Sequence, residues 1–243
     1  MEDYLIQEMA EVQDKLWTLV GKKEIVLSLL DRFLRRKSGN RLLDAGCGCG
    51  LMLSGLKKYG EVSGLEYSEK AIELCRRTNP CEIKKGWLPD NLPYPADHFD
   101  AIIALDVIEH IEDDLAALKA IYGRLRPGGV AVVAVPANMA LWSGHDVVHG
   151  HQRRYDLDQL ADKLRSAGFK IKKISYYNTI MFLPILAIRV VNRLLKRDKP
   201  RSDAKLPPPA VNWLLTRGLL LEKLLLRYFN FRFGVALIAV AEK

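Results

Sequence analysis

The residues best suited to chemistry lie in one polar stretch between Pro136 and Tyr155. Three of the five histidines, His145, His149 and His151, fall within seven residues of one another there. Histidine is the side chain whose unperturbed pKa suits proton abstraction near neutral pH. The stretch therefore predicts a general base. We take His145, with Asp146 beside it, as the first candidate and His151 as the second.

Two other interpretations of these histidines remain open. Loop histidines often only bond to the backbone, and three close together could also hold a metal ion. Their spacing matches no standard zinc pattern, so we expect no metal site. The side chains expected to contact a substrate are His110, Trp142, Arg154 and Tyr155.

The end of the same stretch is expected to lead into a helix. Asp156 and Gln159 have the spacing of a capping box, which places Arg154 just ahead of a helix amino terminus. Such a place suits anion binding. It would equally suit an arginine that pairs with a local carboxylate.

A second group of residues predicts a nucleotide-like ligand. An apolar pair leads into Asp44, then Gly46, Gly48 and Gly50, and a helix-like pattern begins at Leu51. A strand, a tight glycine turn and a helix allow the backbone to approach a ligand closely. The next predicted strand, residues 61–65, ends at Glu66, where an acidic side chain can accept hydrogen bonds from both ribose hydroxyls of an adenosine.

The details of this turn favour one cofactor over another. A dinucleotide fingerprint needs Gly-x-Gly-x-x-Gly, but the third glycine here falls one residue early, and Asp44 places negative charge where a pyrophosphate would lie. A sulfonium ligand with an amino group would favour that charge. The arrangement resembles motif I of the class I S-adenosylmethionine-dependent methyltransferases.

The resemblance continues along the chain and implies S-adenosylmethionine as the cofactor. Lys22 or Lys23 would face its methionine carboxylate. Trp87 departs from the acidic residue usual at its place, so either Trp87 stacks on adenine or Asp90 supplies the acid. Residues 106–110 resemble motif IV, and its Glu109 and His110 are similar to a divalent-ion cluster of some quinone O-methyltransferases. The implied cofactor contacts are Asp44, Gly46, Cys47, Gly48, Glu66, Tyr67, Trp87, Leu88, Leu105 and Lys22.

The expected fold is α/β. Apolar runs at 101–105 and 130–135 are typical of buried parallel strands. The resemblance implies a Rossmann-like sheet of seven strands in the order 3-2-1-4-5-7-6, with strand 7 antiparallel and helices on both faces. We expect one methyltransferase domain over residues 1–243. A helical insertion or lid over 178–233 would join the last two strands, 169–177 and 233–241.

Charge is unevenly distributed along the chain. Residues 1–150 hold 18 Lys+Arg and 22 Asp+Glu, whereas residues 151–243 hold 19 and 7. The basic part points to an anionic partner. In the insertion, basic residues from Arg189 to Arg197, Lys196 among them, alternate with apolar ones, and a polar break follows at 198–209. The apolar runs are too short for a spanning helix, so the segment either packs on the domain or lies on a membrane surface.

These observations predict a methyltransferase acting most often at oxygen, on a small-molecule or lipid-linked acceptor at a membrane surface. The alternative is an N-methyltransferase acting on nucleic acid or protein. Amino-methylating enzymes usually have an Asn- or Asp-Pro-Pro-Tyr/Phe motif where this chain reads Leu-Asp-Val-Ile at 105–108, so we expect no nucleic-acid partner. The four cysteines form no Cys-x-x-Cys pair and no signal peptide is apparent. We expect a cytoplasmic protein, peripheral at the inner face of the membrane, that could form a homodimer.

Overall fold

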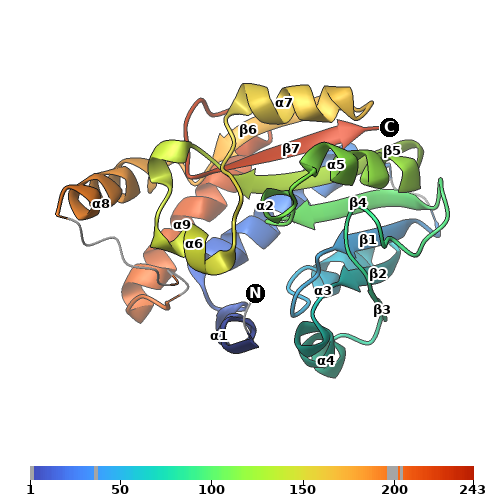
Figure 1. Ribbon diagram of the computed structural model, residues 1–243, viewed down its shortest axis with the longest axis horizontal. Helices are drawn as coiled ribbons and strands as arrows, with labels where there is room; N and C mark the ends of the chain where they lie inside the picture. The colour runs from blue at the N-terminus through green and yellow to red at the C-terminus, as the bar shows by residue number, and fades with distance from the viewer. Residues whose placement is uncertain (1–2, 36–37, 196–201, 203–204) are drawn as a thin grey trace.

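The computed structural model describes residues 3–35, 38–195, 202 and 205–243. Its centre is a seven-stranded sheet in the order β3-β2-β1-β4-β5-β7-β6, as expected (Figure 1). Strand β7 pairs antiparallel with β5 and β6, and the other pairings are parallel. The strands are β1 Arg41–Ala45, β2 Glu61–Glu66, β3 Glu82–Lys85, β4 Phe99–Leu105, β5 Leu125–Pro136, β6 Lys170–Tyr177 and β7 Ala236–Glu242.

Each face of the sheet has its own apolar core, because successive side chains of a strand point to opposite faces. One core joins Leu43, Ile102 and Val133 to helices α5 (Asp114–Arg124) and α7 (Leu157–Ser166). The other joins the neighbouring positions Leu42, Ile103 and Val132 to α2 (Trp17–Phe33), α3 (Leu53–Leu56) and α9 (Pro209–Leu226). Buried residues therefore occupy both faces, which explains the continuous apolar runs.

The turn after β1 needs glycine at its first position. Gly46 has φ +81°, its N–H donates to the carbonyl of Leu65 at 2.8 Å, and an added Cβ would lie 2.4 Å from Val107 Cγ2. The helix expected from Leu51 begins at Leu53. Helix α3 has four residues and passes into a 3-10 turn, η1 (Lys57–Tyr59), which Gly60 ends at φ 156°. Helix α4 (Glu69–Thr78) and the 3-10 turn η2 (Ile108–His110) follow β2 and β4.

The stretch after β5 was expected to be an irregular loop, and this is corrected by the structure. It contains a 3-10 turn, η3 (Met139–Leu141), and a short helix, α6 (Gly144–His149). Ser143 and Asp146 form a capping box at the start of α6, and Gly150 ends the helix in the left-handed conformation. The predicted capping box of Asp156 and Gln159 begins α7. The histidines are thus placed by ordered backbone.

The insertion between β6 and β7 contains two helices, α8 (Phe182–Leu194) and α9. Helix α9 packs along α2, with Leu219 against Gly21 and an ion pair of 3.1 Å between Lys223 and Glu24. Helix α8 lies at the left end of the molecule in Figure 1. Lys196, Arg197 and half of the polar break at 198–209 lie outside the described residues. Among the described residues, no helix is both long and apolar enough to span a bilayer.

Candidate active site

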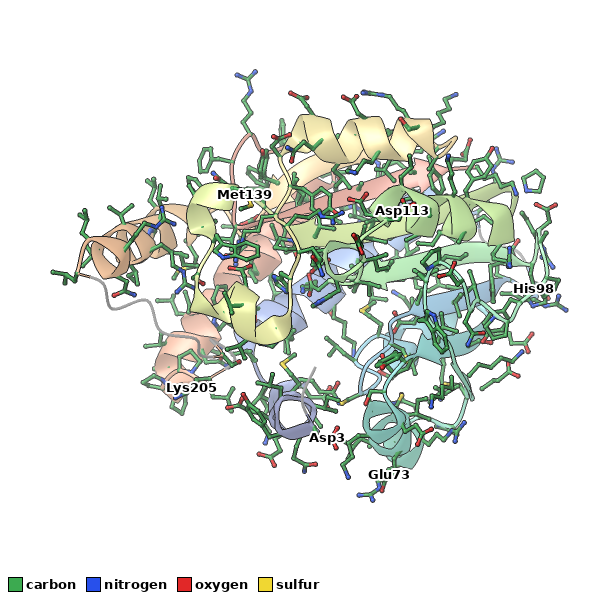
Figure 2. The ribbon with its side chains drawn as sticks, in the orientation of Figure 1. Asp3, Glu73, His98, Asp113, Met139 and Lys205 are labelled. Carbon is green, nitrogen blue, oxygen red and sulfur yellow. The ribbon has the colours of Figure 1, made fainter. Side chains whose placement is uncertain are left out.

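One cavity of about 1000 Å³ opens at the carboxyl ends of β1, β2 and β4. Helix α1 (Asp3–Val12), with Asp3 labelled in Figure 2, contributes to its wall. Its volume lies at the upper end of the range for small-molecule sites, so it can hold two ligands side by side. The two groups of residues predicted from the sequence meet in it. The lining includes all ten expected cofactor contacts: Lys22, Asp44, Gly46, Cys47, Gly48, Glu66, Tyr67, Trp87, Leu88 and Leu105.

Glu66 is held rigidly at the end of β2. Its Oε2 accepts the N–H of Gly48 at 2.9 Å, and its Oε1 accepts the N–H of Ser68 at 2.8 Å. Each oxygen of an ionised carboxylate can accept a further hydrogen bond. The side chain is therefore oriented in advance and retains capacity for the two hydroxyls of a ribose.

The floor of the cavity beside Glu66 is rich in negative charge. Asp44 is buried at the end of β1, and its burial together with the nearby charge of Glu66 raises the pKa of Asp44 to about 7. A cationic ligand group would relieve this repulsion. Next to it, Gly48 has φ +52° and no heavy atom within 4 Å of the place of a Cβ, so the turn is open towards a ligand. These features fit the amino group and sulfonium of S-adenosylmethionine.

Two aromatic residues form one rim of the cavity. The rings of Tyr67 and Trp87 meet edge to face, with centroids 6.1 Å apart, and both are largely exposed. Leu88 lies buried beneath them. Asp90 is not part of the lining, whereas Trp87 is. The position therefore favours Trp87 over Asp90 as a contact for a flat heterocycle.

Of the two candidate lysines, Lys22 reaches the cavity. Its Nζ pairs with Asp106 at the end of β4, whereas Lys23 bonds to Ser54 Oγ at 3.3 Å. Burial by itself would lower the pKa of Lys22, but the charge of Asp106 raises it above its ordinary value. Asp106 has φ +53°, a strained conformation that aims its carboxylate at the lysine. This partner of Lys22 was not expected from the sequence.

Four of the five histidines converge on the opposite wall. The ring centroid of His151 lies 4.8 Å from that of His110 and 6.0 Å from that of His145, and His145 lies 4.2 Å from His149. All four line the cavity. Burial lowers the pKa of His149 to about 4 and also lowers the pKa of His110, with the charge of His151 adding to both effects. The imidazoles of His149 and His110 are therefore neutral at neutral pH.

Asp146 connects His151 to Arg154 rather than serving as a solvent-exposed neighbour of His145. Its Oδ1 lies 2.8 Å from His151 Nδ1, and its two oxygens accept from Arg154 Nε at 2.8 Å and Nη2 at 3.0 Å. Burial alone would raise the pKa of Asp146, but hydrogen bonds from His151 and Arg154 hold it well below its usual range. The carboxylate is thus ionised and fixed. The side chain oriented by Asp146 is therefore that of His151, the second candidate base from the sequence.

Glu109 was not among the expected contacts and faces the same wall. Its carboxylate is fully buried, and neither oxygen has a hydrogen-bond partner in the part of the chain that the structure describes. Burial, followed by the charge of Asp106, raises its pKa well above the ordinary value. Its Oε1 lies 4.0 Å from His151 Nε2. The ligating atoms of Glu109, His110 and His151 lie within 4.8 Å of one another, so these three side chains could hold a metal ion.

Two of the expected substrate contacts are placed elsewhere. Tyr155 is buried in the core, 1% exposed, and its hydroxyl donates to Asp114 Oδ2 at 2.8 Å. Trp142 lies between η3 and α6, and neither residue is part of the cavity lining. Arg154 lines the cavity, but its guanidinium already donates hydrogen bonds to Asp146 and to the carbonyl of Ala137. The aromatic and basic residues between Pro136 and Tyr155 indicated that this stretch binds a substrate. Which of their side chains reach the cavity depends on the turns of η3 and α6.

Comparison with known proteins identifies the family. A family model described as a methyltransferase domain matches residues 21–174, more than half of the chain. The chain belongs to the methyltransferase domain family. A probable S-adenosylmethionine-dependent methyltransferase of Mycolicibacterium smegmatis is 31% identical over 58% of this chain and 56% of its own length. A ubiquinone biosynthesis O-methyltransferase of Ruegeria pomeroyi is 30% identical over 55% of this chain and 61% of its own length. The chain thus matches less than two thirds of either relative.

Solved structures agree on the fold. A complex of the Haloferax volcanii Trm112 methyltransferase activator with a putative methyltransferase contains a chain with TM-score 0.64 and 19% identity, covering 99% of this chain and 94% of that one. An S-adenosylmethionine-dependent methyltransferase of Mesorhizobium loti has a TM-score of 0.59 and 19% sequence identity. The match covers 88% of this chain and 96% of that one. These solved structures therefore share with the chain the Rossmann-like sheet of seven strands.

Loss of the Glu66 carboxylate is expected to weaken cofactor binding by this methyltransferase. The change Glu66→Ala removes two charge-assisted hydrogen bonds to a ribose, so we expect a loss of about 2–3 kcal/mol in binding free energy. Titration calorimetry with S-adenosylmethionine measures it. Glu73→Ala, an exposed change on α4 (Figure 2), is the matched control. Equal affinity in both variants would remove Glu66 from the site.

Cofactor affinity is also expected to depend on pH around the raised pKa of Asp44. Below about 7 Asp44 becomes protonated and no longer attracts the cationic amino group, so affinity should fall as pH falls. If the binding of the cofactor is linked to one proton, its affinity changes by at most about tenfold per pH unit. Calorimetric titrations between pH 6 and 8 measure this slope. Asp44→Asn should bind more weakly with a flat profile, and a slope that survives in Asp44→Asn would contradict the assignment.

Proposed function

We propose that this methyltransferase methylates a hydroxyl oxygen of a small-molecule or lipid-linked acceptor at a membrane surface, with His151 as the general base. The observation that supports it best is the fixed ring of His151, which lies between Asp146 and Glu109 on the wall of the cofactor cavity. The name of the Ruegeria pomeroyi relative, an O-methyltransferase, supports oxygen as the acceptor atom.

The hydrogen bond from Nδ1 to Asp146 decides which nitrogen of His151 can act. An ionised carboxylate only accepts, so Nδ1 holds the proton and Nε2 keeps its lone pair. Nε2 faces the side of Glu109 and the cavity. In this tautomer His151 can remove a proton from an acceptor hydroxyl placed between it and the cofactor site.

When bound, S-adenosylmethionine would supply the methyl group from its sulfonium, and the carbon–sulfur bond would break to leave the neutral thioether S-adenosylhomocysteine. As the carbon–oxygen bond forms, the hydroxyl proton passes to His151 Nε2. The imidazolium then lies beside Asp146, whose negative charge stabilises it. Arg154 holds Asp146 in place through two hydrogen bonds, so its role is positioning. His145, the first candidate from the sequence, lines the same wall and is the alternative base in this proposal.

Action at a membrane surface is supported by the basic insertion, which follows the catalytic part of the chain. A cytoplasmic enzyme, peripheral at the inner face of the membrane, would meet anionic lipids there. Methyl transfer from labelled cofactor to a panel of catechols, phenols and polyprenyl alcohols tests the reaction. Labelled methyl ethers support the proposal, and labelled amines with no ethers would replace it with N-methylation.

A further inference from the structure

Helix α8 carries apolar residues on the side that faces the protein and also on the side that faces outward. The inward side is mixed: Phe182 and Leu186 are half-buried, Ile185 and Arg189 line the cavity, and Arg193 donates to the carbonyls of Ala140 at 3.3 Å and Trp142 at 3.4 Å. No residue of α8 is buried. Its other side exposes the apolar residues Leu183, Ile188, Val191 and Leu194, up to 76% for Leu194. A surface helix normally turns its apolar stripe to the core, so this stripe is expected to face something other than water.

Helix α9 adds a second exposed apolar row. One side of α9 packs on the domain through Leu219 and Leu226. The other side exposes Trp213, 59% exposed, together with apolar residues spaced along the whole helix and just beyond it. These are Val211, Leu214, Leu221, Leu224, Leu225, Tyr228 and Phe229. Scattered exposed leucines are common, but rows on two helices of one insertion mark an interaction surface.

Charge indicates what covers this surface. Residues 178–233 hold 11 Lys+Arg and 3 Asp+Glu. Of the acidic residues, Asp198 and Asp203 lie outside the described residues, and Glu222 is buried, where it accepts from the N–H and hydroxyl of Thr179. The exposed part of α8 and α9 is therefore apolar and basic. Helices that lie in a membrane interface combine apolar rows, aromatic residues and Lys/Arg in this way.

We infer that the outward sides of α8 and α9, called here the α8–α9 surface, dock on an anionic lipid bilayer. This inference rests on the proposed function, which supplies a lipid-linked acceptor, and it adds which surface of the protein contacts the membrane. Because α8 contributes Ile185 and Arg189 to the cavity on one side and its apolar row on the other, docking places the cavity beside the lipid. An acceptor could then enter without crossing water. Neither helix spans the bilayer, so both lie in its interface plane.

Vesicle co-sedimentation of the full chain tests the inference. Wild type is expected to bind phosphatidylcholine vesicles that contain phosphatidylserine at low salt, and to lose binding at high salt or without phosphatidylserine. The double change Leu183→Glu with Val191→Glu, and separately Arg217→Glu on α9, should lower partitioning on the order of tenfold or more. Arg165→Glu on α7, equally exposed, is the matched control and should change little.

Each variant is first shown to fold and to bind S-adenosylmethionine. Equal partitioning of the α8–α9 variants and the α7 control, or no dependence of wild type on phosphatidylserine, would overturn the inference. A concentration-dependent dimer that the same variants dissociate would assign the surface to a second copy of the chain and overturn it as well. The vesicle assay contains no acceptor and measures only lipid binding. A protein that fails to bind vesicles is therefore distinguished from one that fails to methylate a soluble phenol.

Discussion

Replacing His151 with alanine is expected to lower the turnover number for methyl transfer by about 10²–10⁴-fold, the usual contribution of a positioned general base. The affinity for S-adenosylmethionine should change little, because the contacts of His151 are Asp146 and the histidine wall rather than the glycine turn. Turnover with a phenol acceptor and calorimetry with the cofactor give the two quantities separately.

His145→Ala is the matched control for this prediction, since His145 lines the same wall 6.0 Å away in ring centroids. We expect a smaller loss for it than for His151→Ala. If His145→Ala lost turnover while His151→Ala matched wild type, the base would be His145. A loss in His151→Ala that a chelator reproduces in wild type would instead indicate a metal at Glu109, His110 and His151.

The change Asp146→Ala should have the largest effect on stability. It leaves the guanidinium of Arg154, whose side chain is only 6% exposed, buried without its carboxylate. Breaking a buried ion pair from one side costs about 3–5 kcal/mol in the free energy of unfolding. Turnover should fall as well, because His151 loses the group that fixes its tautomer. Denaturant unfolding measures the first effect.

Asp162→Ala on α7 is the control for stability, because its ion pair with Arg165 lies in solvent and should contribute little. Asp146→Asn tests the positioning role separately, since it keeps the shape of the side chain but can also donate. We expect Asp146→Asn to reduce turnover more than it reduces cofactor affinity. Equal stability of Asp146→Ala and Asp162→Ala would contradict the buried pair.

The cofactor half of the site was predictable from sequence because its contacts are local. Gly46 and Gly48 belong to one turn, and Glu66 ends the next strand, so the order of the strands already places them together. The strand order that places β1 between β2 and β4 was implied by the resemblance to the methyltransferase family, and the structure confirms it. The same reasoning suggested Trp87, which departs from the family's usual residue but lines the cavity.

The acceptor half was less predictable because it depends on contacts between distant elements. Asp146 was paired with its neighbour His145 by sequence, but the turn at Gly150 brings His151 back to it. Glu109 approaches His151 only because η2 lies against the segment after α6, where the N–H of Gln152 donates to the carbonyl of Glu109 at 2.8 Å. Periodicity likewise predicted an amphipathic α8, but it cannot tell which side faces the protein.

The general-base role of His151 is tested most directly with a series of phenols of increasing acidity. Phenols that are already ionised at the assay pH need no base, so the deficit of His151→Ala relative to wild type should shrink steadily as phenol acidity rises. The measurement is single-turnover methyl transfer by both proteins at saturating S-adenosylmethionine. We predict near-equal rates for the most acidic phenols. A deficit that stays constant across the series would contradict proton removal by His151.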